Sequence, residues 1–146
     1  MGISNLSTVD WPGNLSAVVF LQGCDLRCPW CQNVEGINPR KGKLAETGRV
    51  LRQIKELKPM ITAVVLSGGE PLLQPGAAAE LLKGAKRLGL KTAIETNATH
   101  PEALGTIISH LDFVAIDVKA PLSNPRLYEK VTGSKEVEIV EKVRKS

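Results

Sequence analysis

Residues 17–31 read AVVFLQGCDLRCPWC, a short apolar run followed directly by three cysteines. The run at residues 17–21 is rich in Val and bulky apolar side chains and is bounded by polar and Gly residues, so it predicts a buried β-strand. The cysteines follow where this strand ends. In parallel α/β folds, loops at the carboxyl ends of strands bind ligands, so this stretch indicates both the fold and the site.

Further apolar runs rich in β-branched residues alternate with segments of helical spacing. The predicted strands are residues 17–21, 62–66, 91–94 and 113–118, and the predicted helices are residues 49–57, 77–88, 101–111 and about 135–145. Strands that alternate with helices favour right-handed crossovers and a parallel sheet. The predicted fold class is therefore α/β, either as an open sheet or as a partial TIM-like barrel.

The size and composition are those of one globular domain. The chain has 146 residues and is 42% hydrophobic, which is enough for one core, so we expect a single domain over residues 1–146. The apolar runs are far shorter than the ~20 residues that cross a bilayer, and the first residues lack a secretory signal pattern. The sequence thus predicts a cytoplasmic protein with no membrane span.

The charge is mildly basic, with a formal net charge of +4 and a pI near 9.1. The chain has only two Trp, two Phe and one Tyr, and its basic residues form no stripe interleaved with them, so we expect no nucleic-acid partner. A basic rim could instead attract an acidic electron-transfer protein.

Polar groups follow the other predicted strands as well. They are Ser67-Gly68-Gly69-Glu70-Pro71, Glu95-Thr96-Asn97 and Asp117-Val118-Lys119. Because parallel strands end at one edge of the sheet, these groups should gather beside the cysteines. A purely structural α/β protein would need only turn residues there.

The three cysteines suit a metal cluster better than a disulfide. Cys24, Cys28 and Cys31 lie too close together for ordinary structural disulfides, and any pairing leaves one thiol over. A structural zinc site needs four ligands, and the two histidines, His100 and His110, lie in a different βα unit. A C-x3-C-x2-C loop suits a [4Fe-4S] cluster with one iron left without a protein ligand. A non-catalytic iron-sulfur or zinc module stays open as an alternative.

The cysteine spacing, with Trp30 before the last cysteine, resembles that of the radical S-adenosylmethionine superfamily. The resemblance implies that S-adenosylmethionine chelates the open iron and is cleaved reductively to a 5′-deoxyadenosyl radical. It further implies that backbone carbonyls of Gly68 and Gly69 approach the methionyl amino group of the cofactor, with Glu70 adding negative charge. No catalytic residue is expected beyond the residues that hold the cluster and the cofactor.

Three further segments resemble the opening of glycyl-radical enzyme activating proteins. They are Thr8-Val9-Asp10-Trp11-Pro12-Gly13, Phe20-Leu21-Gln22-Gly23-Cys24 and Cys31-Gln32-Asn33, and their nearest match is to the anaerobic ribonucleoside-triphosphate reductase activating proteins. The resemblance implies a glycyl-radical protein as partner and a flavodoxin or ferredoxin-type electron donor. It also implies that Glu95, Thr96, Asp117 and Lys119 lie near the methionyl carboxylate, with a monovalent cation as a further expected ligand.

Two questions stay open at this level. Radical enzymes that act on a small heterocycle, such as deazapurine-forming enzymes, share the cysteine loop, so the substrate is less well specified than the cofactor. Many relatives continue to a six-strand partial barrel, whereas four strands are predicted here. The sequence therefore does not separate a naturally short form from a C-terminally truncated one.

Overall fold

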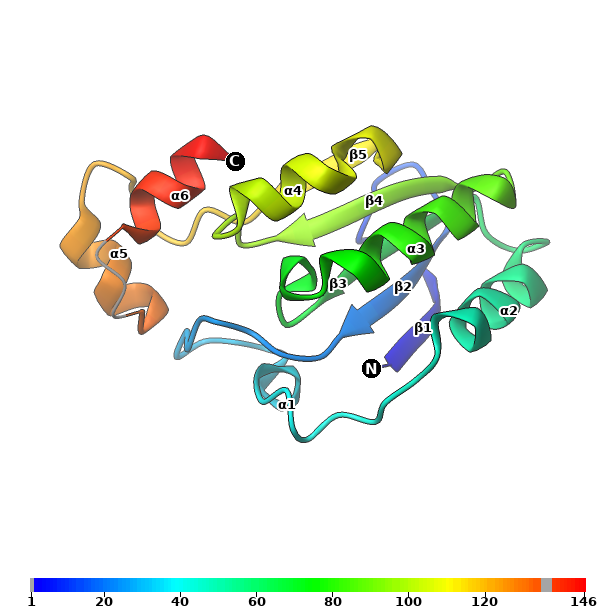
Figure 1. Ribbon diagram of the computed structural model, residues 1–146, viewed down its shortest axis with the longest axis horizontal. Helices are drawn as coiled ribbons and strands as arrows, with labels where there is room; N and C mark the ends of the chain where they lie inside the picture. Colours follow the sequence, from blue (N-terminus) through cyan, green and yellow to red (C-terminus); the bar gives the residue numbers. More distant parts are fainter. Residues whose placement is uncertain (1, 135–137) are drawn as a thin grey trace.

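The computed structural model describes residues 2–134 and 138–146. In these residues one sheet runs in chain order from β1 to β5 (Figure 1). Its strands are β1 (Gly2–Ser7), β2 (Ser16–Leu21), β3 (Ala63–Gly68), β4 (Lys91–Thr96) and β5 (Phe113–Ile116). β2 to β5 are parallel, as predicted, and the α/β class is confirmed. The sheet stays open, with β1 and β5 at its edges.

The edge strand β1 was missing from the sequence-based prediction. It pairs antiparallel with β2, and most of its residues are half-buried or exposed. Ser4, Asn5 and Ser7 give it a polar composition that lacks the apolar run of the inner strands. An edge strand with little burial carries only a weak sequence signal.

The helices confirm the predicted alternation with strands. They are α1 (Val34–Ile37), α2 (Thr47–Leu57), α3 (Pro75–Arg87), α4 (Pro101–Ile107), α5 (Pro125–Thr132) and α6 (Ile139–Lys145), with 3-10 turns at Pro71–Leu73 and Ile108–His110. The single helix predicted over residues 101–111 is divided into α4 and the second 3-10 turn. The helix predicted over residues 135–145 matches α6, but residues 135–137 lie outside the described residues. α1 and α5 were not predicted.

The main core lies between the sheet and helices α2, α3 and α4. Ala17, Val19 and Leu21 of β2 face this core, and alternate residues of β3 and β4 do the same. All of the core residues in β2 and β3 are at most 1% exposed. The burial of these strands explains why their apolar runs are continuous.

Trp11, from the β1–β2 connection, covers part of the opposite face of the sheet. Val18, Val65 and Ala93 form a small apolar patch on which Trp11 packs. The Trp11 ring also stacks on Phe113 of β5, with ring centroids 5.3 Å apart. Further along this face β2 continues with Phe20, which packs on the same patch, whereas β3 and β4 continue with the polar residues Ser67 and Glu95.

A second core joins the last helices to the loop after β2, here called the cysteine loop (residues 22–31). Its buried members are Leu26, Ala98, Tyr128, Ile139, Val140 and Val143, and Cys24 and Cys28 pack against them. In Figure 1, α5 and α6 lie beyond the carboxyl ends of the strands, on the side where this loop runs. The cysteine loop therefore rests on its own apolar support.

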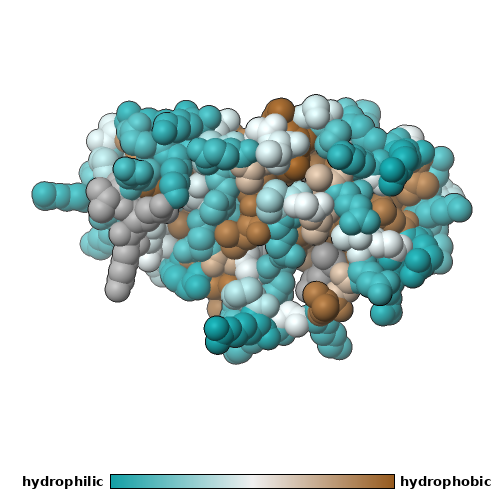
Figure 2. All heavy atoms as spheres, in the orientation of Figure 1, coloured by the Kyte–Doolittle hydropathy of each residue, from teal (hydrophilic) through white to brown (hydrophobic). Residues whose placement is uncertain are grey.

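The face shown in Figure 2 is largely hydrophilic, and hydrophobic atoms surface in separate small areas. None of the described helices combines the length and apolar character needed to traverse a bilayer.

Candidate functional site

A cavity of about 410 Å³ opens at the carboxyl ends of the parallel strands. It is lined by Cys24, Leu26, Cys28, Trp30, Cys31, Gln32, Asn33, Ile37, Ser67, Gly68, Gly69, Glu95, Thr96, Asn97, Asp117 and Lys119. Every site residue predicted from the sequence lines this cavity except Glu70. The size is within the range of small-molecule sites in proteins. The structure thus confirms the prediction that the strand ends gather beside the cysteines.

The cysteine loop is held by backbone bonds from both sides. The Cys24 N–H donates to the Ile37 carbonyl at 3.0 Å, and the Arg27 N–H donates to the Thr132 carbonyl at 2.7 Å. The Arg27 guanidinium also donates to the Cys24 carbonyl at 2.6 Å. These bonds give the loop a defined shape.

The thiols are free and half-buried. Burial raises the pKa of the Cys24 thiol to about 11, an effect reinforced by the nearby Asp25 charge. Burial also raises the pKa of Cys28, although the Lys119 charge opposes the rise. Metal binding must displace these protons, since only thiolates ligate iron.

The donor set fits an iron-sulfur cluster. Three soft sulfur donors from one loop line one cavity, which is the ligand chemistry of such clusters. Among the residues that the structure describes, no three His, Cys, Asp or Glu side chains are arranged to hold a single metal ion.

Gly68 and Gly69 bring the end of β3 against the cysteine loop. A Cβ at Gly69 would lie 2.0 Å from the Gly23 carbonyl oxygen, and one at Gly68 would lie 2.4 Å from that of Leu21. Gly68 also has a φ of +118°, which favours glycine. The glycines are therefore needed for the contact between the two strand ends, in addition to any role toward a cofactor.

Glu70 lies behind the cavity wall. Its side chain is fully buried and accepts hydrogen bonds from the Leu72 N–H at 2.9 Å, the Thr96 hydroxyl at 2.8 Å and the Asn97 N–H at 2.8 Å. Burial raises the pKa of this carboxyl group, while these hydrogen bonds oppose the rise. Glu70 thus ties β3 to β4, and its expected contact with the cofactor stays a prediction.

Two pairs of polar side chains also line the cavity. The Ser67 hydroxyl donates to Oε2 of Glu95 at 2.6 Å, and burial raises the pKa of Glu95. The Lys119 ammonium donates to the Asp117 carboxylate. Burial would lower the pKa of Lys119, but the hydrogen bond to Asp117 raises it. The cavity therefore offers a charged ammonium group beside a carboxylate.

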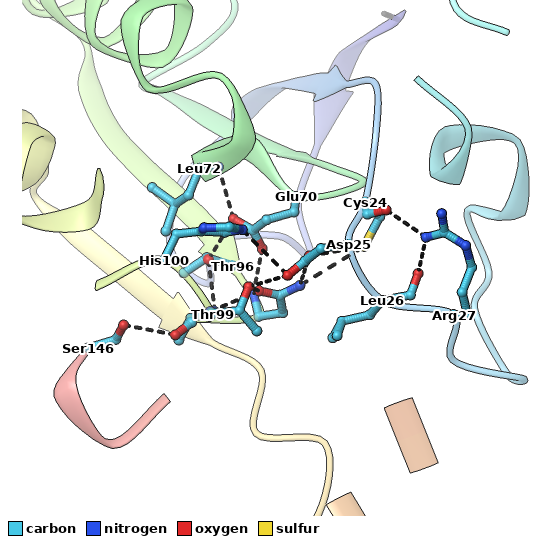
Figure 3. Close-up of polar contacts among 12 residues, drawn as sticks. Cys24, Asp25, Leu26, Arg27, Glu70, Leu72, Thr96, Thr99, His100 and Ser146 are labelled. Atoms are coloured by element: carbon cyan, nitrogen blue, oxygen red, sulfur yellow. Dashed lines mark hydrogen bonds and ion pairs between the residues drawn. The ribbon is translucent and has the colours of Figure 1, made fainter. Parts of the chain in front are cut away.

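Asn33, Asn97 and Asp25 were not predicted as site residues. Asn33 and Asn97 line the cavity, and Nδ2 of Asn33 reaches the Gly68 carbonyl at 3.5 Å. Asp25 accepts from Asn97 and Thr99 and also lies beside His100 (Figure 3). Burial would raise the pKa of Asp25, but the contacts with His100, Thr99 and Asn97 hold it far below the usual range. The position of Asp25 beside Cys24 was the only signal in the sequence.

Three relatives resemble much of the chain. A Methanocaldococcus jannaschii protein named as a glycyl-radical enzyme activating enzyme is 42% identical over 121 residues, which cover 81% of this chain and 49% of that protein. A pyruvate formate-lyase-activating enzyme of Clostridium pasteurianum is 37% identical over 121 residues, covering 80% and 50%. A 7-carboxy-7-deazaguanine synthase of Methanopyrus kandleri is 31% identical over 134 residues, covering 79% and 53%. The chain spans about half the length of these curated relatives.

The family is shown by a match over most of the chain. The model of the radical SAM superfamily matches residues 18–146, which include the cysteine loop and every strand end that lines the cavity. This chain therefore belongs to the radical SAM superfamily.

Proposed function

We propose that the chain binds a [4Fe-4S] cluster and S-adenosylmethionine and generates a glycyl radical on a partner enzyme. In this reaction one electron and one S-adenosylmethionine give methionine and 5′-deoxyadenosine, and a glycine of the partner loses a hydrogen atom. The single observation that supports it best is the cavity, in which three cysteines meet the polar ends of the neighbouring strands.

Each cavity wall has a proposed binding role. Cys24, Cys28 and Cys31 hold three irons of the cluster and leave the fourth without a protein ligand. The backbone at Gly68 and Gly69 receives the methionyl amino group.

The ends of β4 and β5 would bind the methionyl carboxylate. Lys119 lines the cavity, and its ammonium group has N–H donors beyond the one that Asp117 accepts, so we propose that it pairs with the methionyl carboxylate. Glu95, Thr96 and Asp117 offer oxygen ligands near this carboxylate, and we propose them for a monovalent cation.

When bound, the reduced cluster supplies the electron that breaks a sulfur–carbon bond of S-adenosylmethionine. The protein orients the bound methionyl group and limits the access of water. Trp30 and Leu26 line parts of the cavity with apolar surface, while Ser67 and Asn97 line it with polar groups. The half-buried Glu95 on the cavity wall and the buried Glu70 behind it would favour a cationic sulfonium group in the cavity.

The proposed partner is a glycyl-radical enzyme. Within this class we propose anaerobic ribonucleoside-triphosphate reductase, on the sequence resemblance of residues 8–13 and 20–24, although pyruvate formate-lyase-activating enzymes are among the relatives. A flavodoxin or ferredoxin-type protein in a reducing cytoplasm is the proposed electron donor.

The test is anaerobic reconstitution of the full chain with iron and sulfide, followed by reduction in the presence of S-adenosylmethionine. We expect methionine and 5′-deoxyadenosine, and a glycyl radical by electron paramagnetic resonance when a reductase is added. Cleavage no faster than that of a Cys28→Ala control contradicts the proposal.

A second candidate is a reaction on a small heterocycle, favoured by the 31% identity to a 7-carboxy-7-deazaguanine synthase. The two candidates differ in what accepts the radical. Cleavage of S-adenosylmethionine coupled to turnover of a small heterocycle would favour the second candidate, provided that no glycyl radical forms on anaerobic ribonucleoside-triphosphate reductase or on pyruvate formate-lyase. Membership in the radical SAM superfamily argues against the non-catalytic zinc module.

A further inference from the structure

The part of the cysteine loop next to Cys24 is tied to the turn after β4 through one carboxylate, that of Asp25 (Figure 3). Nδ2 of Asn97 donates to its Oδ1 at 3.0 Å, and the Thr99 hydroxyl donates to its Oδ2 at 2.6 Å. Nε2 of His100 lies 3.4 Å from the same Oδ2. The turn that supplies these three side chains is called here the β4–α4 turn (residues 97–100).

The β4–α4 turn is buried and has a defined shape. Thr99 is 1% exposed and Asn97 is 6% exposed. The backbone N–H of Ala98 donates to the Thr96 hydroxyl, and that of Thr99 donates to Oδ1 of Asn97, both at 3.0 Å. Ala98 has a φ of 60°, a strained value for a residue with a Cβ. The surrounding bonds hold this conformation and aim the donors of Asn97 and Thr99 at Asp25.

A second carboxylate, that of Glu70 after β3, also contacts this region. It accepts hydrogen bonds from the Thr96 hydroxyl and the Asn97 N–H. Two carboxylates from two neighbouring strand ends therefore converge on the end of β4. Asp25 connects the cysteine loop to the end of β4, and Glu70 connects the segment after Gly69 to it. The relative placement of the three strand ends depends on both.

We propose that Asp25 is a positioning residue, which fixes Cys24 relative to the cofactor-binding strand ends by clamping the cysteine loop to the β4–α4 turn. The proposal rests on the proposed function in one respect, namely that Cys24 binds iron. A loop ordered before metal arrives has already lost its conformational entropy, so the cluster is bound more tightly. Groups that orient metal ligands in this way typically change metal affinity by about 10- to 100-fold.

Thr99 offers a matched pair of variants. Thr99→Val removes the hydroxyl donor and keeps the branched shape, whereas Thr99→Ser keeps the donor and loses a buried methyl group. A packing role predicts the larger effect for the Ser variant, and the clamp predicts it for the Val variant. Asp25→Asn removes the charge directly, and Glu80→Gln, at an exposed site on α3, is the control.

Hydrogen exchange of the metal-free full chain tests the clamp without any cofactor. Peptides covering residues 24–28 should exchange faster in Asp25→Asn and in Thr99→Val than in the wild type. Thr99→Ser and Glu80→Gln should match the wild type. Wild-type exchange of this segment in both Asp25→Asn and Thr99→Val overturns the proposal.

The reconstituted protein supplies the second readout. An iron chelator should remove iron about 10-fold faster from Asp25→Asn and Thr99→Val than from the wild type, and Thr99→Ser should retain it. The change that S-adenosylmethionine causes in the spectrum of the reduced cluster should differ in the same two variants. Equal iron loss from the Val and Ser variants would count against the clamp. If the wild type assembled no cluster, the proposed function would fail, and the exchange data would still decide the clamp.

Discussion

The side chains around the cavity differ in what they contact, and this decides what each substitution should do. Lys119 lines the cavity, whereas Glu70 makes its contacts inside the protein. The first should affect ligand binding, and the second should affect the fold.

Lys119→Met should weaken S-adenosylmethionine binding by about 10- to 100-fold, since one charge-assisted hydrogen bond contributes about 1.5–3 kcal/mol. Cluster assembly should be unchanged, because Lys119 is not proposed as an iron ligand. Titration of the spectral change of the reduced cluster measures the affinity. Lys83→Met, at an exposed site on α3, is the matched control, and an equal loss there would contradict the assignment.

Glu70→Gln should destabilise the protein, because the carboxylate accepts three hydrogen bonds in a fully buried position. The amide would place an NH2 group against one of these donors. A loss of about 1–3 kcal/mol in the free energy of unfolding is expected from one unsatisfied buried polar group. Denaturant unfolding of the metal-free protein measures it, with Glu80→Gln as the control. An unchanged stability would mean that Glu70 does not tie β3 to β4 as described.

His100 should make stability depend on pH. The Asp25 carboxylate, 3.4 Å from Nε2, raises the pKa of His100, against burial, with Glu70 raising it further and Lys142 opposing. Its contribution is therefore full below the unfolded-state pKa of about 6.5 and is lost as pH rises through the higher folded-state pKa. The difference in unfolding free energy between the wild type and His100→Gln should shrink over this range. A difference that is constant with pH would exclude protonated His100 as the cause.

At the scale of elements, the contact between the ends of β2 and β3 sets the position of the cysteine loop. The Glu70 N–H donates to the Gly23 carbonyl at 2.7 Å, and the Gly69 N–H donates to that of Leu21 at 2.9 Å. Such a close backbone approach leaves no room for a side chain at Gly69.

Gly69→Ala should therefore displace the cysteine loop. The new methyl group would lie 2.0 Å from the Gly23 carbonyl oxygen, and such overpacking costs at least about 1–3 kcal/mol. Thermal unfolding and iron content after reconstitution should both fall. Gly105→Ala is the control, because it is in α4 with no atom near the new Cβ and should stabilise the helix by about 0.5–1 kcal/mol. A Gly69 variant as stable as the Gly105 variant would contradict the close contact.

At the scale of the whole molecule, two apolar cores have different tasks. The main core holds the helices to the sheet, and the second core holds α5 and α6 to the cysteine loop. Ile54 belongs to the first and Ile139 to the second, and both are at most 1% exposed.

Ile54→Ala and Ile139→Ala should each cost about 2–5 kcal/mol, but with different local effects. Ile139→Ala should raise hydrogen exchange in residues 24–28 more than in β3, because it weakens the support under that loop. Ile54→Ala should raise exchange across the sheet. Indistinguishable exchange patterns would show that the two cores unfold as one unit.

The sequence was informative wherever the signal is local. Inner strands have continuous apolar runs because both of their faces are buried, and the cysteine spacing follows from one short loop. The beginning of α5 also has a local signal, since Asn124 caps it and Pro125 occupies its first turn, although no helix was predicted there. The polar composition of β1 carried no comparable signal.

The clustering of site residues could be predicted, but their individual contacts could not. Parallel strands end at one edge of the sheet, so the gathering of Cys24, Gly68, Glu95 and Asp117 follows from topology alone. Whether a side chain at a strand end enters the cavity or the protein interior depends on the packing of its neighbours. Glu70 is fully buried because donors from β4, far along the chain, meet its carboxylate there. Asp25 meets Thr99 across 74 positions of sequence for the same reason, and only the tertiary structure brings two such distant positions into contact.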